Sequence, residues 1–237
     1  MKNTVYSLFI VFILFLVSCK EEDSKPKVSY DLSEKTPAIK TELPKILLAD
    51  LPIQMQGTTV LLHPIGAFSV SEGVSKSKYA EAESENFTIS NYSENEIAGY
   101  ISNIKFQQIG SDSLKMLTEK PILIERITYL KSIADNTKNQ ILVYIVSDMD
   151  TNKDEKLDSN DIKSLYLSKI DGTSFTKISE ELMELIDWNI VESNNRLYFR
   201  SVEDTNKNGE FDNNDIIHYH YIDLTESEWK VQNYSPI

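Results

Sequence analysis

The chain has 237 residues, and 24 Lys and Arg stand against 37 Asp and Glu, a formal net charge of −13 at pH 7. Such an acidic surface repels phosphate backbones and anionic lipid headgroups, so we expect no binding to nucleic acid. With seven glycines and one cysteine, Cys19, the sequence has neither a Gly-rich phosphate loop nor a disulfide framework. A folded part of about 180 residues can bury a sufficient core without disulfides.

The N-terminus has the three-part layout of a secretory signal. Lys2 precedes the apolar run Leu8–Val17, and the small residue Ser18 stands directly before Cys19. A helix that crosses a bilayer needs about 20 apolar residues, so this shorter run makes a permanent transmembrane anchor the weaker interpretation. We therefore expect residues 1–18 to be a signal peptide. Either this signal peptide is an ordinary one and the cysteine after it is incidental, or Cys19 is a site of lipidation.

The tetrapeptide 16–19, Leu-Val-Ser-Cys, resembles the lipobox of bacterial lipoproteins, in which the thiol is lipidated and the chain is cut before the cysteine. The resemblance implies a Gram-negative outer-membrane lipoprotein that reaches the membrane through lipid on Cys19. The following run Lys20–Asp23 resembles the export signal of some surface lipoproteins, although it is also an ordinary charged start to a tether. A cell-surface and a periplasm-facing position both stay open.

A tether is predicted over residues 19–55, because four of the seven prolines fall between residues 20 and 55 among Lys, Glu, Ser and Thr. The apolar patch Ile46–Leu51 inside it is a candidate for docking onto the folded part. From residue 56 onward the composition changes to short β-branched and aromatic runs that are divided by polar turns, which predicts strands. Glu180–Ile186 is the one segment expected to form a helical turn or two. The clearest expected strands are Thr59–Leu62, Ile122–Leu130, Ile141–Val146, Leu165–Leu167 and Leu197–Val202.

The sequence repeats itself within the expected β domain, 56–237. Residues 141–178 match 195–232 without a gap at a shift of 54, and a fainter third copy lies upstream at a shift of 61. These copies predict three units, about 56–118, 119–179 and 180–237. The predicted fold class is all-β, with repeated antiparallel units that form either propeller blades or an open stacked array.

One hairpin carries a family resemblance. Residues 166–179 contain a strand, the turn Asp171-Gly172 and a second strand, and they resemble the blade repeats of TolB-type propellers. The resemblance extends loosely over about residues 103–232. It implies a blade-like fold and no particular partner.

Two twelve-residue segments, 150–161 and 204–215, occupy the same place in two of the copies. Ca²⁺ takes six to eight oxygen ligands, which a surrounding loop supplies from positions 1, 3, 5, 7 (a backbone carbonyl), 9 and 12. Both segments match this spacing and resemble EF-hand and dockerin-type calcium loops, with Asp at position 12 as in dockerins. An acidic turn without an ion is the alternative. The predicted ligands of two Ca²⁺ sites are Asp150, Asn152, Asp154, Lys156, Asp158 and Asp161 in the first segment, and Asp204, Asn206, Asn208, Glu210, Asp212 and Asp215 in the second.

The two segments differ at position 6, where a calcium loop normally needs Gly for a positive φ. Gly209 supplies it in the second segment, whereas Glu155 occupies that position in the first. The first segment has four carboxylates at ligand positions and the second has three, so the sequence does not rank their affinities. Asp148 is a possible additional ligand. Because the flanks are strand-like, we expect calcium to stabilise an interstrand connection and not to open a helix pair.

Other candidate sites are weaker. His218 and His220 alternate on a strand and face one way, but a metal ion needs a third ligand. Four aromatic residues offer a possible sugar-stacking platform, although aromatics at strand spacing more often form core or cross-strand pairs. These four are Trp188, Trp229, Tyr219 and Tyr221.

No catalytic constellation is recognisable, so a non-enzymatic envelope protein that binds or scaffolds an unknown envelope protein or glycan is expected. An envelope enzyme or accessory subunit acting on polysaccharide is the alternative. A cleft with two isolated acids and aromatics, away from the calcium loops, would favour that alternative.

Overall fold

The computed structural model describes residues 25–30, 46–68 and 88–237, so the expected signal peptide and Cys19 lie outside the described residues. The fold is all-β, as predicted, with three antiparallel sheets of which none closes into a barrel. The strands are β1 (Ile46–Ala49), β2 (Ile53–Gln54), β3 (Val60–Phe68), β4 (Ser90–Ser93), β5 (Glu96–Ile101), β6 (Asn103–Gln108), β7 (Leu114–Met116), β8 (Leu123–Tyr129), β9 (Ile141–Ser147), β10 (Ser164–Lys169), β11 (Thr176–Lys177), β12 (Met183–Val191), β13 (Arg196–Glu203), β14 (Ile216–Asp223) and β15 (Gln232–Asn233).

Each sheet contains one four-stranded antiparallel unit whose strands lie side by side in the order in which they occur along the chain, although other strands intervene in the sequence of the first unit. The units are β1-β3-β6-β7, β8-β9-β10-β11 and β12-β13-β14-β15. The short β2 pairs with β3, and the hairpin β4–β5 joins the edge of the middle sheet beside β8. The expected repeat is therefore confirmed: the shift of 54 residues carries β9 onto β13 and β10 onto β14.

The first unit begins earlier than the composition suggested. β1 and β2 lie within residues 19–55, the stretch predicted as a tether, and both pair with β3. The apolar patch that starts at Ile46 is thus an edge strand of the first sheet, in line with its expected docking.

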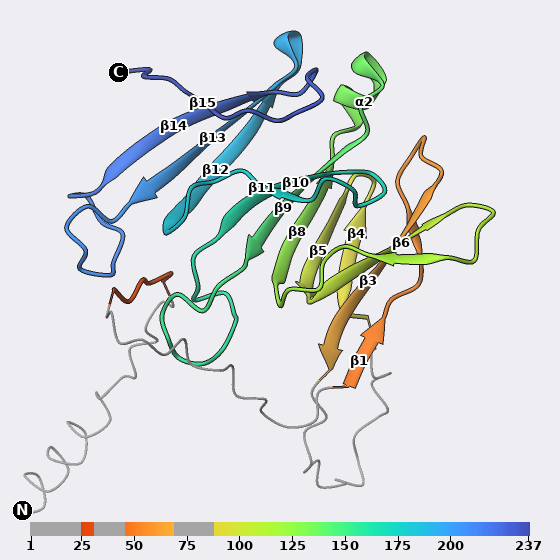
Figure 1. Cartoon of the computed structure of the whole chain (residues 1–237), viewed down its shortest axis with the longest axis horizontal. Helices are drawn as coiled ribbons and strands as arrows, with labels where there is room; N and C mark the ends of the chain where they lie inside the picture. The colour runs from red at the N-terminus through yellow and green to blue at the C-terminus, as the bar shows by residue number, and fades with distance from the viewer. Residues whose placement is uncertain (1–24, 31–45, 69–87) are drawn as a thin grey trace, which may run out of the picture.

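The middle sheet lies between the other two, so the three sheets form an open stack (Figure 1). One core cluster joins the first and middle sheets, for example Leu62 with Leu142 and Tyr144. A second cluster joins the middle and last sheets, for example Val143 with Leu197. Successive side chains of a strand point to opposite faces, so a strand covered on both faces needs apolar residues at nearly every position. The continuous run Ile-Leu-Val-Tyr-Ile-Val of β9 meets this requirement.

The helical expectation at Glu180–Ile186 is wrong. These residues enter β12 at Met183, where the alternate side chains Met183 and Leu185 are buried. Leu182 has φ +59°, which ends any helical turn before the strand. The residues are good helix formers, but pairing with β13 and burial of one face decide the conformation.

A helix forms instead between β8 and β9, as α2 (Lys131–Thr137). It buries Ile133 and Ala134, and it ends at Lys138 in the left-handed conformation. Among the described residues, no helix combines the length and the apolarity needed to cross a bilayer.

Candidate functional site

The two predicted calcium loops lie at the same end of neighbouring units (Figure 1). The first loop, 150–161, connects β9 to β10, and the second loop, 204–215, connects β13 to β14. Both loops are thus inserted at the same step of the repeated unit and are flanked by strands, as the sequence predicted. The flanking strands fix the ends of each loop.

In the first loop, the carboxylates at positions 1 and 12 gather the backbone amides of the turn. Asp161 at position 12 accepts the amide of Thr151 at 2.7 Å and that of Asp158 at 2.9 Å. Asp150 at position 1 accepts the amides of positions 5 and 6 at 3.2 and 2.9 Å. With the amide of Asn152, which donates to Asp161 at 3.4 Å, five backbone amides converge on two carboxylates and hold the loop closed.

The second loop repeats the bonds from positions 2, 5, 6 and 9. Asp215 accepts the amides of Thr205 at 3.2 Å and Asp212 at 2.8 Å, and Asp204 accepts those of positions 5 and 6 at 3.2 and 2.7 Å. In both loops the side-chain oxygens at positions 3, 5 and 9 each accept the amide two residues further on. The side chains at positions 1, 3, 5, 9 and 12 of both loops thus turn an oxygen towards their own loop.

The backbone at position 6 has the positive φ that the sequence pattern requires. Glu155 has φ +69° and Gly209 has φ +85°. Position 4 is also left-handed in both loops, with φ +61° at Lys153 and +56° at Lys207. The first loop therefore adopts the shape of the second without a glycine, at a strain of about 1 kcal/mol.

The donor types suit a hard cation. Asp and Asn oxygens and one backbone carbonyl per loop are the ligands that Ca²⁺ prefers. Within the described ranges, no three Asp, Glu, His or Cys side chains converge closely enough to hold a metal ion by themselves. Asn and main-chain oxygens would therefore have to complete each donor set, which the spacing of both loops provides.

Asp161 carries a charge that is costly in this position. Its side chain is fully buried, and burial raises its pKa against the opposing effect of the backbone amides that it accepts. The nearby carboxylate of Asp150 adds like-charge repulsion and raises the pKa further. A cation bound in the first loop would offset both the burial of the Asp161 carboxylate and its repulsion by Asp150.

Asp148, considered above as a further ligand, is engaged elsewhere. Its carboxylate accepts the Tyr166 hydroxyl at 2.6 Å and pairs with the Lys177 ammonium at 2.9 Å. It thus ties β9 to the β10–β11 hairpin.

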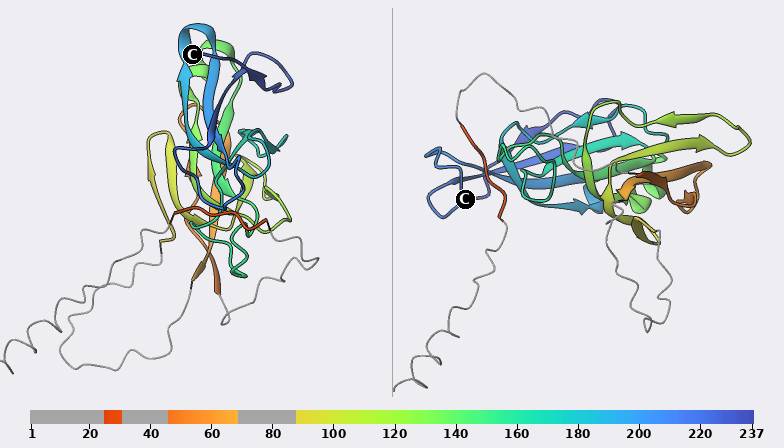
Figure 2. Two further views of the ribbon diagram at one scale, coloured as in Figure 1. Left: turned by 90° about the vertical axis from the view of Figure 1, so that its left-hand side faces the viewer. Right: turned by 90° about the horizontal axis from the view of Figure 1, so that it is seen from below.

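A short N-terminal segment crosses between the two loops, which the sequence did not predict (Figure 2). We call residues 25–30 the strap. The amides of Lys27 and Ser29 donate to carbonyls of the first loop at 3.2 and 2.8 Å, and the intervening amide of Val28 donates to the second loop at 3.0 Å. The strap is therefore an extended chain with alternate amides on opposite sides, as in a strand between two neighbours.

Side chains reinforce the strap. Val28 is buried between the loops, and the Thr151 hydroxyl donates to the carbonyl of Lys27 at 3.0 Å. Burial, together with the charge and hydrogen bond of Asp204, raises the pKa of Tyr30 to about 12. At Gly209 a Cβ would clash with the carbonyl oxygen of Val28. The glycine in the second loop thus serves both its own backbone and the passage of the strap.

The two histidines on β14 have separate local roles. The His218 ring pairs with Glu203 at 2.8 Å. His220 is buried; its Nδ1 lies 2.8 Å from Asn233 Oδ1 and its Nε2 lies 3.2 Å from Ser201 Oγ. This is the order of groups in a nucleophile–base–amide triad, but Ser201 is fully buried on an inner sheet face, where a substrate has no access.

The four aromatic residues proposed as a platform do not share one surface. Trp188 and Trp229 pack against the second core cluster. Tyr219 and Tyr221 point from β14 to the opposite face, where the Arg196 guanidinium lies 4.4 Å from the ring centre of Tyr221.

A carboxylate cluster lies between the middle and last units. Glu184 accepts the amide of Lys163 at 2.7 Å, and the Lys163 ammonium is 3.9 Å from the carboxylate of Glu125. Burial raises the pKa of Glu184 to about 7, Lys163 lowers it and Glu125 raises it further. Burial also raises the pKa of Glu125. The cluster is half-buried, and Lys163 links Glu125 of β8 to Glu184 of β12.

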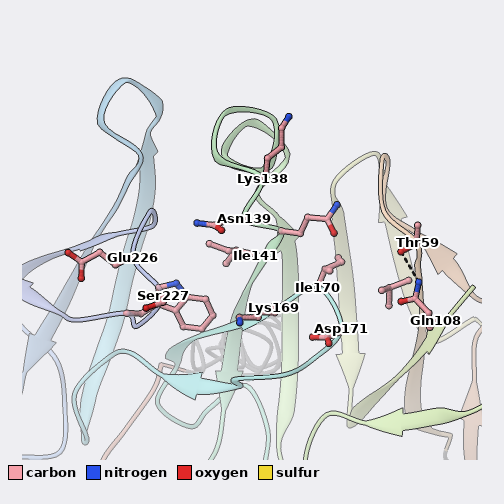
Figure 3. A pocket seen from close by; sticks show the side chains of 13 residues that line it. Thr59, Gln108, Lys138, Asn139, Ile141, Lys169, Ile170, Asp171, Glu226 and Ser227 are labelled. Carbon is pink, nitrogen blue, oxygen red and sulfur yellow. Dashed lines mark hydrogen bonds between the residues drawn. The ribbon is translucent and has the colours of Figure 1, made fainter.

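A pocket of about 440 Å³ opens at the end of β9 and β10 opposite to the loops (Figure 3). Residues of all three units surround it: Thr59 and Gln108 stand on one side, and Glu226 and Ser227, from the β14–β15 connection, stand on the other, with the middle unit between them. The lining includes two acids, one tryptophan, two lysines and three side-chain amides. These are Asp171, Glu226, Trp229, Lys138, Lys169, Gln108, Asn139 and Gln140.

The chain matches no protein-family model and no curated protein. The function must therefore be inferred from the loops, the strap and the pocket.

Proposed function

We propose that the protein is a calcium-binding, lipid-anchored protein of the cell envelope that acts as a non-enzymatic binding or scaffold module. The observation that carries the calcium proposal is the repetition of one hydrogen-bond network in two loops that lie 54 residues apart. A turn that only needs to be polar has no reason to repeat its oxygens at positions 1, 3, 5, 9 and 12.

Calcium has a structural role in this proposal. Each loop is fixed between two strands of a sheet, so an ion cannot open a helix pair as it does in a sensor. An ion that binds only the folded state stabilises it by about 2.7 kcal/mol at a concentration 100 times its Kd. Two such sites would contribute about 5 kcal/mol, a large share of the stability of an ordinary domain.

Calorimetry of the full chain in calcium and in chelator tests the proposal. For a domain of this size 1 kcal/mol corresponds to a Tm change of about 2–4 °C, so two saturated sites should raise Tm by about 10–20 °C. Magnesium is the matched control, since it is smaller and demands octahedral geometry, and it should raise Tm less. An unchanged Tm on calcium addition would contradict the calcium proposal.

The anchor is proposed from the sequence alone, through the lipobox-like residues that end at Cys19. Growth with a fatty-acid analogue should label the protein, and the Cys19→Ala variant should stay unlabelled and be released from membranes. Labelling of the variant would place the lipid elsewhere or show that the analogue marks another group. Absence of label on the parent chain would refute the anchor.

The pocket supports a second candidate, an accessory role on polysaccharide. It lies away from the loops, and its lining includes a tryptophan, several amides and two acids that stand on opposite sides. Such side chains offer the hydrogen bonds and the apolar surface that sugar rings need. The pKa of Asp171 is lowered, because hydrogen bonds from Thr173 outweigh burial, so this acid is ionised and suited to accept hydroxyl groups.

A pull-down of envelope proteins and glycans by the chain lacking residues 1–19 separates these roles. Glycan binding that is weakened by Glu226→Gln, an exposed position at the pocket rim, would favour the polysaccharide role. Asp112→Asn, which removes an exposed charge outside the pocket lining, is the control. Capture of one envelope protein irrespective of the pocket variant would favour the scaffold.

A further inference from the structure

The strap is held by both loops at once. Lys27 and Ser29 donate their amides to the first loop, and Val28 donates to the second. A cavity of about 510 Å³ remains beside the strap, lined by the strap and by residues of both loops, mainly of the second. The strap therefore occupies a groove that neither loop forms alone.

The acceptors of the strap are main-chain carbonyls of the loops. They belong to Thr151 at position 2 and Asn160 at position 11 of the first loop, and to Gly209 at position 6 of the second. Each of these residues stands directly beside a proposed ion ligand in the sequence. Any rearrangement of the ligands therefore moves the carbonyls that receive the strap.

The free energy of docking the strap is close to zero, so the position of the loop carbonyls decides whether the strap docks. The strap gains a few hydrogen bonds and the burial of one valine, and it loses the conformational freedom of about six backbone positions. These contributions are of similar size, so docking depends on acceptors that are already in place. Without a cation, four like charges in the first loop and three in the second oppose that arrangement.

We infer that the groove between the loops is a binding site for residues 25–30 of the same chain, and that calcium in the loops builds this site. The inference rests on the proposed calcium binding. It gives calcium a consequence beyond stability. With lipid on Cys19, five residues of sequence separate the anchor from a docked strap, and five residues span at most about 17 Å. With the strap released, the anchor is separated from β1 by 26 residues of sequence, which span about 90 Å at most.

Hydrogen exchange of the purified full chain measures docking directly. In calcium the amides of Lys27, Val28 and Ser29 should exchange at least about tenfold more slowly than in chelator. The amides of β9 serve as an internal control, since they lie in the middle sheet and should stay protected in both conditions. Calcium binding is measured separately by titration calorimetry on the same sample.

A glycine pair separates the strap contact from general backbone strain. Gly209→Ala places a methyl group against the Val28 carbonyl at a residue with φ +85°. Gly110→Ala introduces a methyl group at φ +87°, where nothing lies within 4 Å. In calcium, Gly209→Ala should expose the strap amides to exchange while the first loop still binds an ion, and Gly110→Ala should leave the strap protected.

The outcomes are distinguishable. If calcium binds and raises Tm but strap exchange is the same in chelator, the inference is wrong and the proposed function stands. If calcium does not bind, both are wrong. Protection of the strap in Gly209→Ala equal to that in Gly110→Ala would also overturn the inference, because the strap would then not depend on the second loop.

Discussion

Replacing Asp161 by Asn tests whether the first loop depends on its buried carboxylate. Asp161 accepts the Thr151 amide through Oδ1 and the Asp158 amide through Oδ2. An Asn side chain has a single acceptor oxygen, so one of these two amides loses its partner. Since the side chain is fully buried, water does not readily replace the lost acceptor, and we expect a loss of about 1–3 kcal/mol even without calcium.

In calcium the loss should be larger, because the variant also removes a charge from the first ion site. At a calcium concentration 100 times the Kd, abolishing one site removes a further contribution of about 2.7 kcal/mol. The total expected loss in free energy of unfolding is thus about 4–6 kcal/mol in calcium. Urea denaturation of the full chain in calcium and in chelator measures both values.

Asp215→Asn is the matched control, at the same position of the second loop. The native Asp215 carboxylate accepts the amides of Thr205 and Asp212, as Asp161 does in the first loop. Thr205 and Asp212 are exposed, so water can bind whichever amide loses its acceptor in the variant. In chelator this variant should lose less than about 1 kcal/mol. Equal losses for the two variants in chelator would refute the argument from burial. A loss for Asp161→Asn that is the same in calcium and in chelator would refute the ion site in the first loop.

Two further variants test the packing between units. Burial raises the pKa of Glu184 from 4.5 to about 7, so between these values the folded chain holds a proton that the unfolded chain has released. The free energy of unfolding should therefore fall by up to about 3 kcal/mol as the pH rises through this window. Urea titrations at a series of pH values measure this fall, and Glu184→Gln should abolish it. The same pH dependence in parent and variant would show that Glu184 is ionised throughout. Gly172→Ala combines φ +76° with a clash against the Phe106 ring and should cost about 2–3 kcal/mol. Gly57→Ala, at φ +78° in open space, should cost only about 1 kcal/mol, and equal Tm losses would mean that the ring contact contributes nothing.

The units and the loops were predictable because their signals are local or periodic. The shift of 54 residues aligns whole strands, and the loop pattern fixes oxygen donors at set positions. The pattern even required a left-handed residue at Glu155, which has φ +69°. The error at Glu180–Ile186 arose because helix-forming composition was weighed without the partner strand β13, which only the tertiary structure provides.

The strap could not be predicted, since nothing in residues 25–30 marks it as an ordered segment. Its partners lie far along the chain: the hydroxyl of Thr151 donates to the carbonyl of Lys27 across 124 residues. The one hint was the difference at position 6, where Gly209 stands opposite Glu155. The sequence shows that difference, but only the close approach of Val28 explains why the second loop keeps its glycine.

The seam between the middle and last units has a consequence for how such a protein could arise. One copy of the unit presents one loop and has no groove; a tandem copy places a second loop opposite the first, and a recess appears at the junction without any new segment being added. The two loops differ where they meet the strap: Thr151 is buried in the first, and Gly209 replaces Glu155 at position 6 in the second. Repetition of one fold element thus provides a receptor for a piece of the same polypeptide, and a further unit with the same loop would provide a second junction of this kind.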